Sequence, residues 1–211
     1  MKLFDLDGTL LDSNGLWREI DVQFLAKRGI PWTPEYNEGV IHAIFPIAAQ
    51  FTRDFCHLEE TPEEIMAEWL EMAREGYART LKVKDGVMDY LDQCLQTGER
   101  MALFTSAEPS LCHAALSDRG FDRYLTDVVF AQHLGMEKRS PAAFREAARR
   151  LGVRPEEITF YDDSPIACRG AKGAGFTVIG VYDGCFAEYE AEMRSFCDGY
   201  IRSFRDLVER S

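Results

Sequence analysis

The sequence predicts an α/β protein: a parallel sheet flanked by helices and interrupted by an all-helical insertion. After Lys82, short apolar runs alternate with helical segments, a rhythm typical of βα units. Between Ser13 and Lys82 the signals are helical and no strand is convincing. The chain has 211 residues, 46% of them hydrophobic, which is enough for one sizeable buried core that carries a smaller insert.

The first predicted element is a strand over Lys2 to Phe4. It ends where two acids, Asp5 and Asp7, precede the turn chemistry of Gly8-Thr9. In a parallel α/β sheet, ligands bind at the carboxyl ends of the strands. The acidic pair therefore lies where a functional site is expected.

The insertion is predicted to consist of helices. Leu16, Ile20 and Phe24 fall on one face of the first helix, and Thr33-Pro34 places a cap before a proline at the first helical position. Thr61 to Glu64 combines such a proline with a capping box. The apolar face that follows comprises Ile65, Met66, Trp69, Leu70, Ala73 and Tyr77.

Four further strands are predicted after the insertion, at Met101 to Phe104, Asp127 to Ala131, Ile158 to Tyr161 and Thr177 to Val181. We therefore divide the chain into a core of residues 1–12 and 83–211 and a helical cap of residues 13–82. The cap leaves the core just after the acidic pair and returns near Asp85-Gly86. This placement puts it over the end of the first strand, as a lid that selects the substrate.

Composition narrows the class of partner. A net charge of −12 argues against nucleic acid or an anionic membrane as the main partner, because either would require a basic face. No basic segment followed by an apolar run opens the sequence, and no apolar stretch is long enough to span a bilayer. We expect a cytoplasmic protein, a monomer or weak dimer, that binds a small molecule or a metal. Its scattered cysteines are expected to be reduced: Cys56, Cys94, Cys112, Cys168, Cys185 and Cys197.

Polar residues follow the other predicted strands as well. One strand is followed by Thr105-Ser106 and another by Asp162-Asp163, while Lys138 precedes a helix that Ser140 can cap. Four carboxylates at one edge cannot all stay ionised without a cation, and oxygen ligands suit Mg²⁺. The hydroxyls, the ammonium group and a helix N-terminus after Asp163 favour an anion. Together these features predict phosphate chemistry.

A carboxylate can attack phosphorus while a second one protonates the leaving oxygen and later activates water. Asp5 and Asp7 could divide these roles, because residues i and i+2 of an extended segment point the same way. Mg²⁺ and Lys138 would neutralise the charge of the transferring group.

These residues resemble the haloacid dehalogenase-like (HAD) hydrolase superfamily. The segment DLDGT at Asp5 to Thr9 looks like its DxDGT motif, and Thr105, Lys138 and Asp162-Asp163 match its other motifs in order. The resemblance continues through AKGAGF, GVYDG and DGYIRSFRDL at Ala171 to Phe176, Gly180 to Gly184 and Asp198 to Leu207.

The resemblance implies a Rossmann-like core with a helical cap, Asp5 as nucleophile and Asp7 as acid and base. It implies Mg²⁺ held by Asp5, the backbone carbonyl of Asp7 and the fourth motif, so that both Asp162 and Asp163 are metal candidates. The second aspartate of the DxD points to phosphate esters rather than dehalogenation. The lysine motif reads KRSP where K-P-x-P is usual, which leaves Arg139 as a conceivable substitute for Lys138.

The remaining site candidates carry weaker signals. We assign Gly8 and Ser106 to phosphate binding, Ser106 through its backbone N–H. Trp17 and Arg53 are candidates for substrate contact, although such a tryptophan is more often cap core, and Arg53 and His42 are more often surface residues than ligands.

Three functions are consistent with these residues. The first is a Mg²⁺-dependent phosphatase that hydrolyses a small phosphorylated metabolite, a sugar or polyol phosphate, through an aspartyl-phosphate. The second is a phosphomutase resembling β-phosphoglucomutase; the resembling mutases carry a histidine about where Trp17 lies, which favours the phosphatase. The third is a catalytically silent binding protein, which the intact motifs disfavour.

Overall fold

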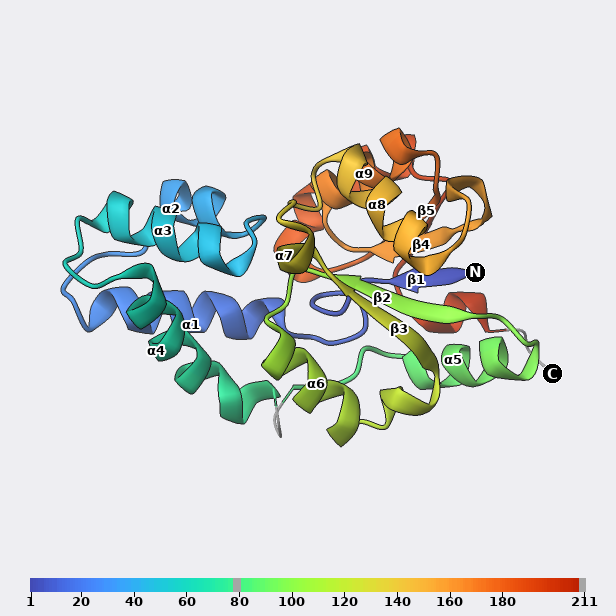
Figure 1. The fold of residues 1–211 in the computed structure, drawn as a ribbon, viewed down its shortest axis with the longest axis horizontal. Coiled ribbons are helices and arrows are strands. Elements are labelled where there is room, and N and C mark those ends of the chain that lie inside the picture. The colour runs from blue at the N-terminus through green and yellow to red at the C-terminus, as the bar shows by residue number, and fades with distance from the viewer. Residues whose placement is uncertain (78–80, 209–211) are drawn as a thin grey trace.

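The computed structural model describes residues 1–77 and 81–208; residues 78–80 of the predicted cap and the last three residues of the predicted core lie outside the described residues. A six-stranded parallel sheet with the order β3-β2-β1-β4-β5-β6 forms its centre (Figure 1). The predicted α/β fold with a parallel sheet is confirmed. The strands are β1 (Lys2–Phe4), β2 (Met101–Thr105), β3 (Leu125–Phe130), β4 (Thr159–Asp162), β5 (Thr177–Val181) and β6 (Gly199–Ile201).

The short strand β1 lies at the middle of the sheet. It pairs with β2 on one side and β4 on the other, with Phe4 opposite both Leu103 and Tyr161. The strand order reverses here, because the chain moves outward from β1 in both directions, and such a point is where α/β sheets place their ligands. The register brings Asp5, which follows β1, beside the end of β4 at Asp162.

Helices cover both faces of this sheet (Figure 1). Alternate strand residues serve the two faces: Leu3 and Phe160 pack against α8 and α9, whereas Phe4 and Tyr161 pack in the cluster that includes α5 and α6. The core helices are α5 (Val87–Gln96), α6 (Pro109–Asp118), α7 (Ala131–Leu134), α8 (Pro141–Leu151), α9 (Pro165–Ala174) and α10 (Glu190–Phe196). Short 3-10 helices occur at Phe121–Arg123, Pro155–Glu157, Gly184–Tyr189 and Phe204–Leu207.

Between β1 and α5, the described residues form four α-helices in a separate layer beyond one end of the sheet, and we call them the cap (Figure 1). Their capping signals are confirmed: the Thr33 side chain accepts from the Tyr36 N–H, and Thr61 and Glu64 form a capping box. The cap helices are α1 (Asn14–Ala26), α2 (Pro34–Val40), α3 (Phe45–Cys56) and α4 (Pro62–Glu75). The exact division of the chain at residues 12–13 and 82–83 stays a prediction.

The two connections between cap and core run antiparallel beside each other. Leu11 bridges to Val83, and the Asp12 N–H donates to the Lys82 carbonyl at 2.9 Å. The Lys84 ammonium then donates to the Gly8 and Tyr182 carbonyls, both at 2.6 Å. These bonds fasten the base of the cap to the loop that follows β1.

The structure differs from the sequence prediction at two strands. β3 begins at Leu125 and ends at Phe130, because Ala131 already belongs to α7, so the predicted run was displaced toward the C-terminus. The edge strand β6 has only 3 residues and was not predicted as a strand. Among the described residues, no helix is long and apolar enough to span a membrane, and the six cysteines are free.

Candidate active site

Three carboxylates meet at the carboxyl end of the sheet. Asp5, Asp162 and Asp163 follow or end the neighbouring strands β1 and β4, and each offers an oxygen within 4.8 Å of the others. All three are buried. The sequence prediction that these acids converge is therefore met by their positions.

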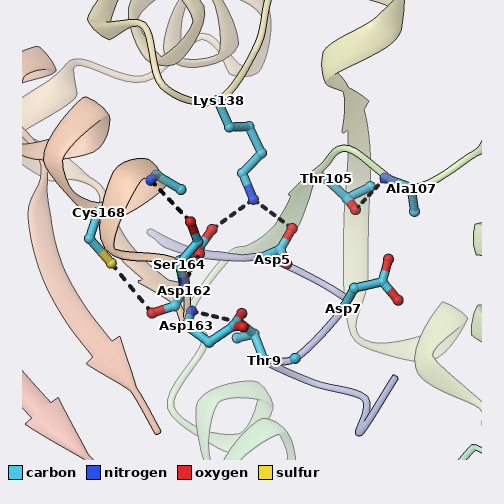
Figure 2. A network of polar contacts seen from close by, with 12 residues as sticks. Asp5, Asp7, Thr9, Thr105, Ala107, Lys138, Asp162, Asp163, Ser164 and Cys168 are labelled. Atoms are coloured by element: carbon cyan, nitrogen blue, oxygen red, sulfur yellow. Dashed lines mark hydrogen bonds and ion pairs between the residues drawn. The ribbon is translucent and has the colours of Figure 1, made fainter. Parts of the chain in front are cut away.

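Lys138 supplies the positive charge of this cluster (Figure 2). Its ammonium lies 2.6 Å from Asp5 Oδ1 and 2.7 Å from Asp162 Oδ2. Burial alone would lower the pKa of Lys138, but Asp162 and Asp5 outweigh it and raise that pKa. Arg139 instead pairs with Glu137 at the surface. Of the two basic residues that the KRSP segment offered, Lys138 is the one that contacts the carboxylates.

The loop after β1 holds Asp163 in place. Thr9 Oγ1 donates to Asp163 Oδ1 and Asn14 Nδ2 to Asp163 Oδ2, both at 2.8 Å. Gly8 has φ +74°, and a Cβ there would lie 2.2 Å from Asp163 Oδ2. Its N–H donates to the Leu11 carbonyl at 2.8 Å. Gly8 was predicted to bind phosphate; its N–H serves the turn instead, and the glycine is required by the close approach of Asp163.

The cluster carries more negative charge than its own lysine neutralises. Burial raises the pKa of Asp162 to about 6, although Lys138 opposes the shift. Burial, reinforced by Asp162 and Asp5, raises the pKa of Asp163 well above its usual value. Carboxylate oxygens are the ligands that Mg²⁺ prefers. A divalent cation beside these acids would stabilise their ionised forms, so the donor set fits such a metal.

Asp7 lies apart from the three-carboxylate cluster (Figure 2). Its carboxylate accepts hydrogen bonds from the Ser13 hydroxyl at 2.6 Å and from the Tyr77 hydroxyl. Burial, with a further contribution from Asp5, raises the pKa of Asp7 to about 6. The side chain of Asp7 is thus outside the group of possible metal ligands, and the role of its backbone carbonyl, which the family resemblance implies, stays a prediction.

Thr105 and Ser106 lie where β2 ends. Thr105 is buried, and its Oγ1 accepts from the Ala107 N–H at 3.0 Å (Figure 2). Both residues line the same cavity as Asp5 and Lys138. The structure therefore brings the hydroxyls to the carboxylate cluster, as the sequence predicts.

The cluster opens into a cavity of about 290 Å³ between core and cap. This volume is at the lower end of the range for small-molecule sites. The cap contributes most of its apolar wall through tryptophans and phenylalanine, together with several polar groups. Its cap lining includes Trp17, Arg18, Asp21, Trp32, Asn37, His42, Phe45 and Trp69.

Two cap predictions have different outcomes. Trp17 lines the cavity, but its indole N–H donates to the Tyr77 hydroxyl at 2.7 Å. Arg53 is not among the lining residues. It lies on α3, whose Phe45 and Ala48 face the cavity. At 100° and 1.5 Å per residue, Arg53 is rotated by about 140° from Ala48 and about 80° from Phe45, and it lies about 7.5 Å further along the helix axis than Ala48. Its phase and its position along α3 together take it away from the site.

Two titratable residues of the cavity were not predicted: sequence reasoning took His42 as more often a surface residue and did not single out Asp21. His42 stacks on Phe186 of the core at 5.6 Å, and its Nδ1 lies 3.3 Å from Ser164 Oγ. Burial, aided by Arg139, lowers the pKa of His42 to about 4. Asp21 also lines the cavity, and burial raises its pKa to about 7. Nothing in the local sequence distinguishes either residue from a surface charge.

Comparisons with known proteins identify the family of this chain. A family model described as haloacid dehalogenase-like hydrolase matches residues 2–181. The chain is 26% identical over 197 residues to validoxylamine A 7'-phosphate phosphatase of Streptomyces hygroscopicus subsp. limoneus, covering 91% of this chain and 90% of that protein. It is 25% identical over 183 residues to fructose-1-phosphate phosphatase YqaB of Escherichia coli strain K12, covering 85% and 94%.

Solved structures show the same fold. CbbY from Rhodobacter sphaeroides, in complex with phosphate, superposes with a TM-score of 0.82 at 25% identity and covers 98% of this chain and 95% of that chain. β-Phosphoglucomutase from Clostridium difficile superposes with a TM-score of 0.80 at 17% identity, covering 98% and 92%, which is a likeness of fold alone. Because the family model spans most of the sequence, this chain belongs to the haloacid dehalogenase-like hydrolases.

Proposed function

We propose that this hydrolase is a Mg²⁺-dependent phosphatase that releases phosphate from a small phosphorylated sugar or polyol through an aspartyl-phosphate on Asp5. The observation that carries the proposal is the position of Asp5, which lines the cavity beside Lys138 and two further buried carboxylates. Its relatives named as phosphatases support the same class of reaction.

The metal would be held by Asp5, Asp162 and Asp163, with the Asp7 carbonyl as the further ligand that the resemblance implies. When bound, the cation supplies positive charge to the transferring phosphoryl group. Lys138 would supply a second positive charge beside Asp5, and its contact with Asp162 keeps its ammonium in position.

The reaction needs two displacements at phosphorus. In the first, a carboxylate oxygen of Asp5 attacks, the bond from phosphorus to the ester oxygen breaks, and Asp7 gives its proton to the departing oxygen. In the second, Asp7 takes a proton from water, the water oxygen attacks phosphorus, and the bond to Asp5 breaks. Inorganic phosphate leaves, and both aspartates return to their initial state.

The residues that line the cavity favour a substrate with several hydroxyl groups. Aromatic side chains such as Trp17 and Trp32 offer apolar faces, while Asp21 and Asn37 offer hydrogen-bonding groups among them. This mixture suits a molecule that has both C–H faces and hydroxyls. Fructose-1-phosphate phosphatase, one of the relatives, is named for a substrate of that chemistry.

The test is a panel of sugar, polyol and carboxylic-acid phosphates incubated with the protein and Mg²⁺, with inorganic phosphate and isomerised sugar phosphate followed in parallel. We expect free phosphate, fastest from one sugar or polyol ester, and no isomer. The Asp5→Asn variant, checked for folding by circular dichroism, should release none. Isomer without phosphate release, given a bisphosphate primer, would establish the mutase, and no turnover of any ester would favour the silent binding protein.

A further inference from the structure

Asp7 is anchored through one of its two carboxylate oxygens. The Ser13 hydroxyl donates to Asp7 Oδ1 at 2.6 Å, and the Tyr77 hydroxyl donates to the same oxygen. Within residues 1–77 and 81–208, Oδ2 receives no hydrogen bond. Asp7 nevertheless lines the cavity. Among the contacts of the described residues, therefore, Oδ1 is tied to Ser13 and Tyr77 while Oδ2 has no such tie.

The Tyr77 and Ser13 hydroxyls each accept a hydrogen bond from an N–H group, which leaves their own hydrogens to be donated to Asp7. The Trp17 indole N–H lies 2.7 Å from the Tyr77 oxygen, and an indole can only donate. Tyr77 therefore accepts from Trp17, and its own hydrogen is directed to Asp7. In the same way the Gly8 N–H donates to Ser13 Oγ at 3.3 Å, which turns the Ser13 hydrogen toward Asp7. Both hydroxyls are set as donors before any substrate binds.

Tyr77 is itself held firmly, although it does not line the cavity. Its side chain is 0% exposed, and its ring packs edge-on against Trp17 with 5.8 Å between centroids. The guanidinium of Arg119, at the end of α6, donates to the Tyr77 carbonyl at 2.6 Å. The tyrosine thus joins the last turn of the cap, the core and Asp7.

We propose that Tyr77, oriented by Trp17, is a positioning residue that fixes the carboxylate of Asp7 through Oδ1 so that Oδ2 faces the ester oxygen of the substrate. This inference rests on the proposed role of Asp7 as acid and base. It also gives Trp17 a use in the reaction: its indole ring forms part of the cavity wall, and its N–H orients the tyrosine.

The test compares two classes of phosphate ester. An alkyl phosphate needs a proton on its departing oxygen, whereas p-nitrophenolate leaves without one, so only the alkyl ester depends on a well-placed acid. For Tyr77→Phe we expect kcat/KM to fall by about 10- to 100-fold with an alkyl phosphate, because a misplaced acid loses part of the roughly 10²- to 10⁴-fold that general acid catalysis contributes. With p-nitrophenyl phosphate we expect a fall of less than about threefold. A tyrosine with a merely structural role would lower both values equally.

Two further variants complete the experiment. Trp17→Phe should cause a smaller selective loss with alkyl esters. In the double variant the loss with the alkyl ester relative to the p-nitrophenyl ester should be no greater than in Tyr77→Phe alone, because Trp17 acts on the acid through Tyr77. Trp17→Phe also provides the test if Tyr77→Phe does not fold. Tyr90→Phe is the matched control: this buried tyrosine bonds to Tyr161 and lies outside the cavity. It should leave the ratio of the two substrates unchanged.

Failure of this inference is distinct from failure of the proposed function. Equal losses on both esters, or no loss on either, would overturn the positioning role while the wild-type protein remained a phosphatase. Wild-type protein that hydrolysed neither ester, or an Asp5→Asn variant that hydrolysed both, would overturn the function itself.

Discussion

Replacing Lys138 with methionine removes the charge that holds the carboxylate cluster together and keeps the length of the side chain. The Lys138 ammonium lies 2.6 Å from Asp5 and 2.7 Å from Asp162, and the lysine side chain is only 8% exposed. Removing one partner of a buried ion pair costs about 3–5 kcal/mol, because the other charge stays buried and unpaired. We expect Lys138→Met to lower the free energy of unfolding by about this amount near pH 8 without a divalent cation.

The loss in the free energy of unfolding caused by Lys138→Met should be smaller near pH 5 than near pH 8. Burial already raises the pKa of Asp162 and Lys138 opposes that shift, so without the lysine this pKa rises further above that of the unfolded chain. The penalty therefore grows as pH rises and is relieved by protonation as pH falls. Mg²⁺ should restore part of the lost stability, because it binds the folded state.

The assay is urea unfolding at both pH values, in EDTA and in Mg²⁺. Lys172→Met is the matched control, because Lys172 pairs with Asp198 at 2.8 Å at the surface, where the two side chains are 35% and 41% exposed. Such a pair contributes at most about 1 kcal/mol. If Lys138→Met in EDTA were as stable as this control, Lys138 would not be what neutralises the buried acids.

Two other variants test the packing and the electrostatics of the site. Gly8→Ala should lower the free energy of unfolding by more than about 2 kcal/mol and abolish phosphate release, because the new Cβ would lie 2.2 Å from Asp163 Oδ2. Gly29→Ala is the control: Gly29 has φ +70° and no atom within 4 Å of the new Cβ, so only the backbone penalty of about 1 kcal/mol is expected. Asp21→Asn should stabilise the protein by up to about 4 kcal/mol near pH 8 and by less near pH 5, because burial raises the pKa of Asp21 to about 7 and its ionisation therefore penalises the folded state as pH rises. Thermal unfolding at the two pH values measures both effects, and a gain for Asp21→Asn that did not vary with pH would contradict the assignment.

The fold was predictable because its signals are local. Apolar runs marked β1, β2, β4 and β5, and proline after a capping residue marked α2 and α4. The meeting of Asp5 with Asp162 followed from the rule that parallel strands end at one edge. Strand β6 was not predicted, because three residues at a sheet edge are too few to show an alternating pattern.

The rest of the site depends on how the cap packs against the core, which no local pattern records. His42 of the cap and Phe186 of the core are far apart in the sequence, yet their rings stack on each other in the wall of the cavity. The contact of Tyr77 with Asp7 likewise depends on the return of the chain to the core. Arg53 was selected for its charge, whereas its position is decided by the phase of α3.

The central claim is that Asp5 becomes phosphorylated, and the Asp7→Asn variant allows a direct test with p-nitrophenyl phosphate and Mg²⁺. This ester needs no acid for its first step, while the second step lacks its base, so the phosphorylated protein should accumulate. We expect a burst of about one equivalent of p-nitrophenol per protein, with mass spectrometry after an acid quench locating the phosphoryl group on the peptide that contains Asp5. No burst and an unmodified Asp5 peptide, with wild-type protein that hydrolyses the same ester, would contradict the account.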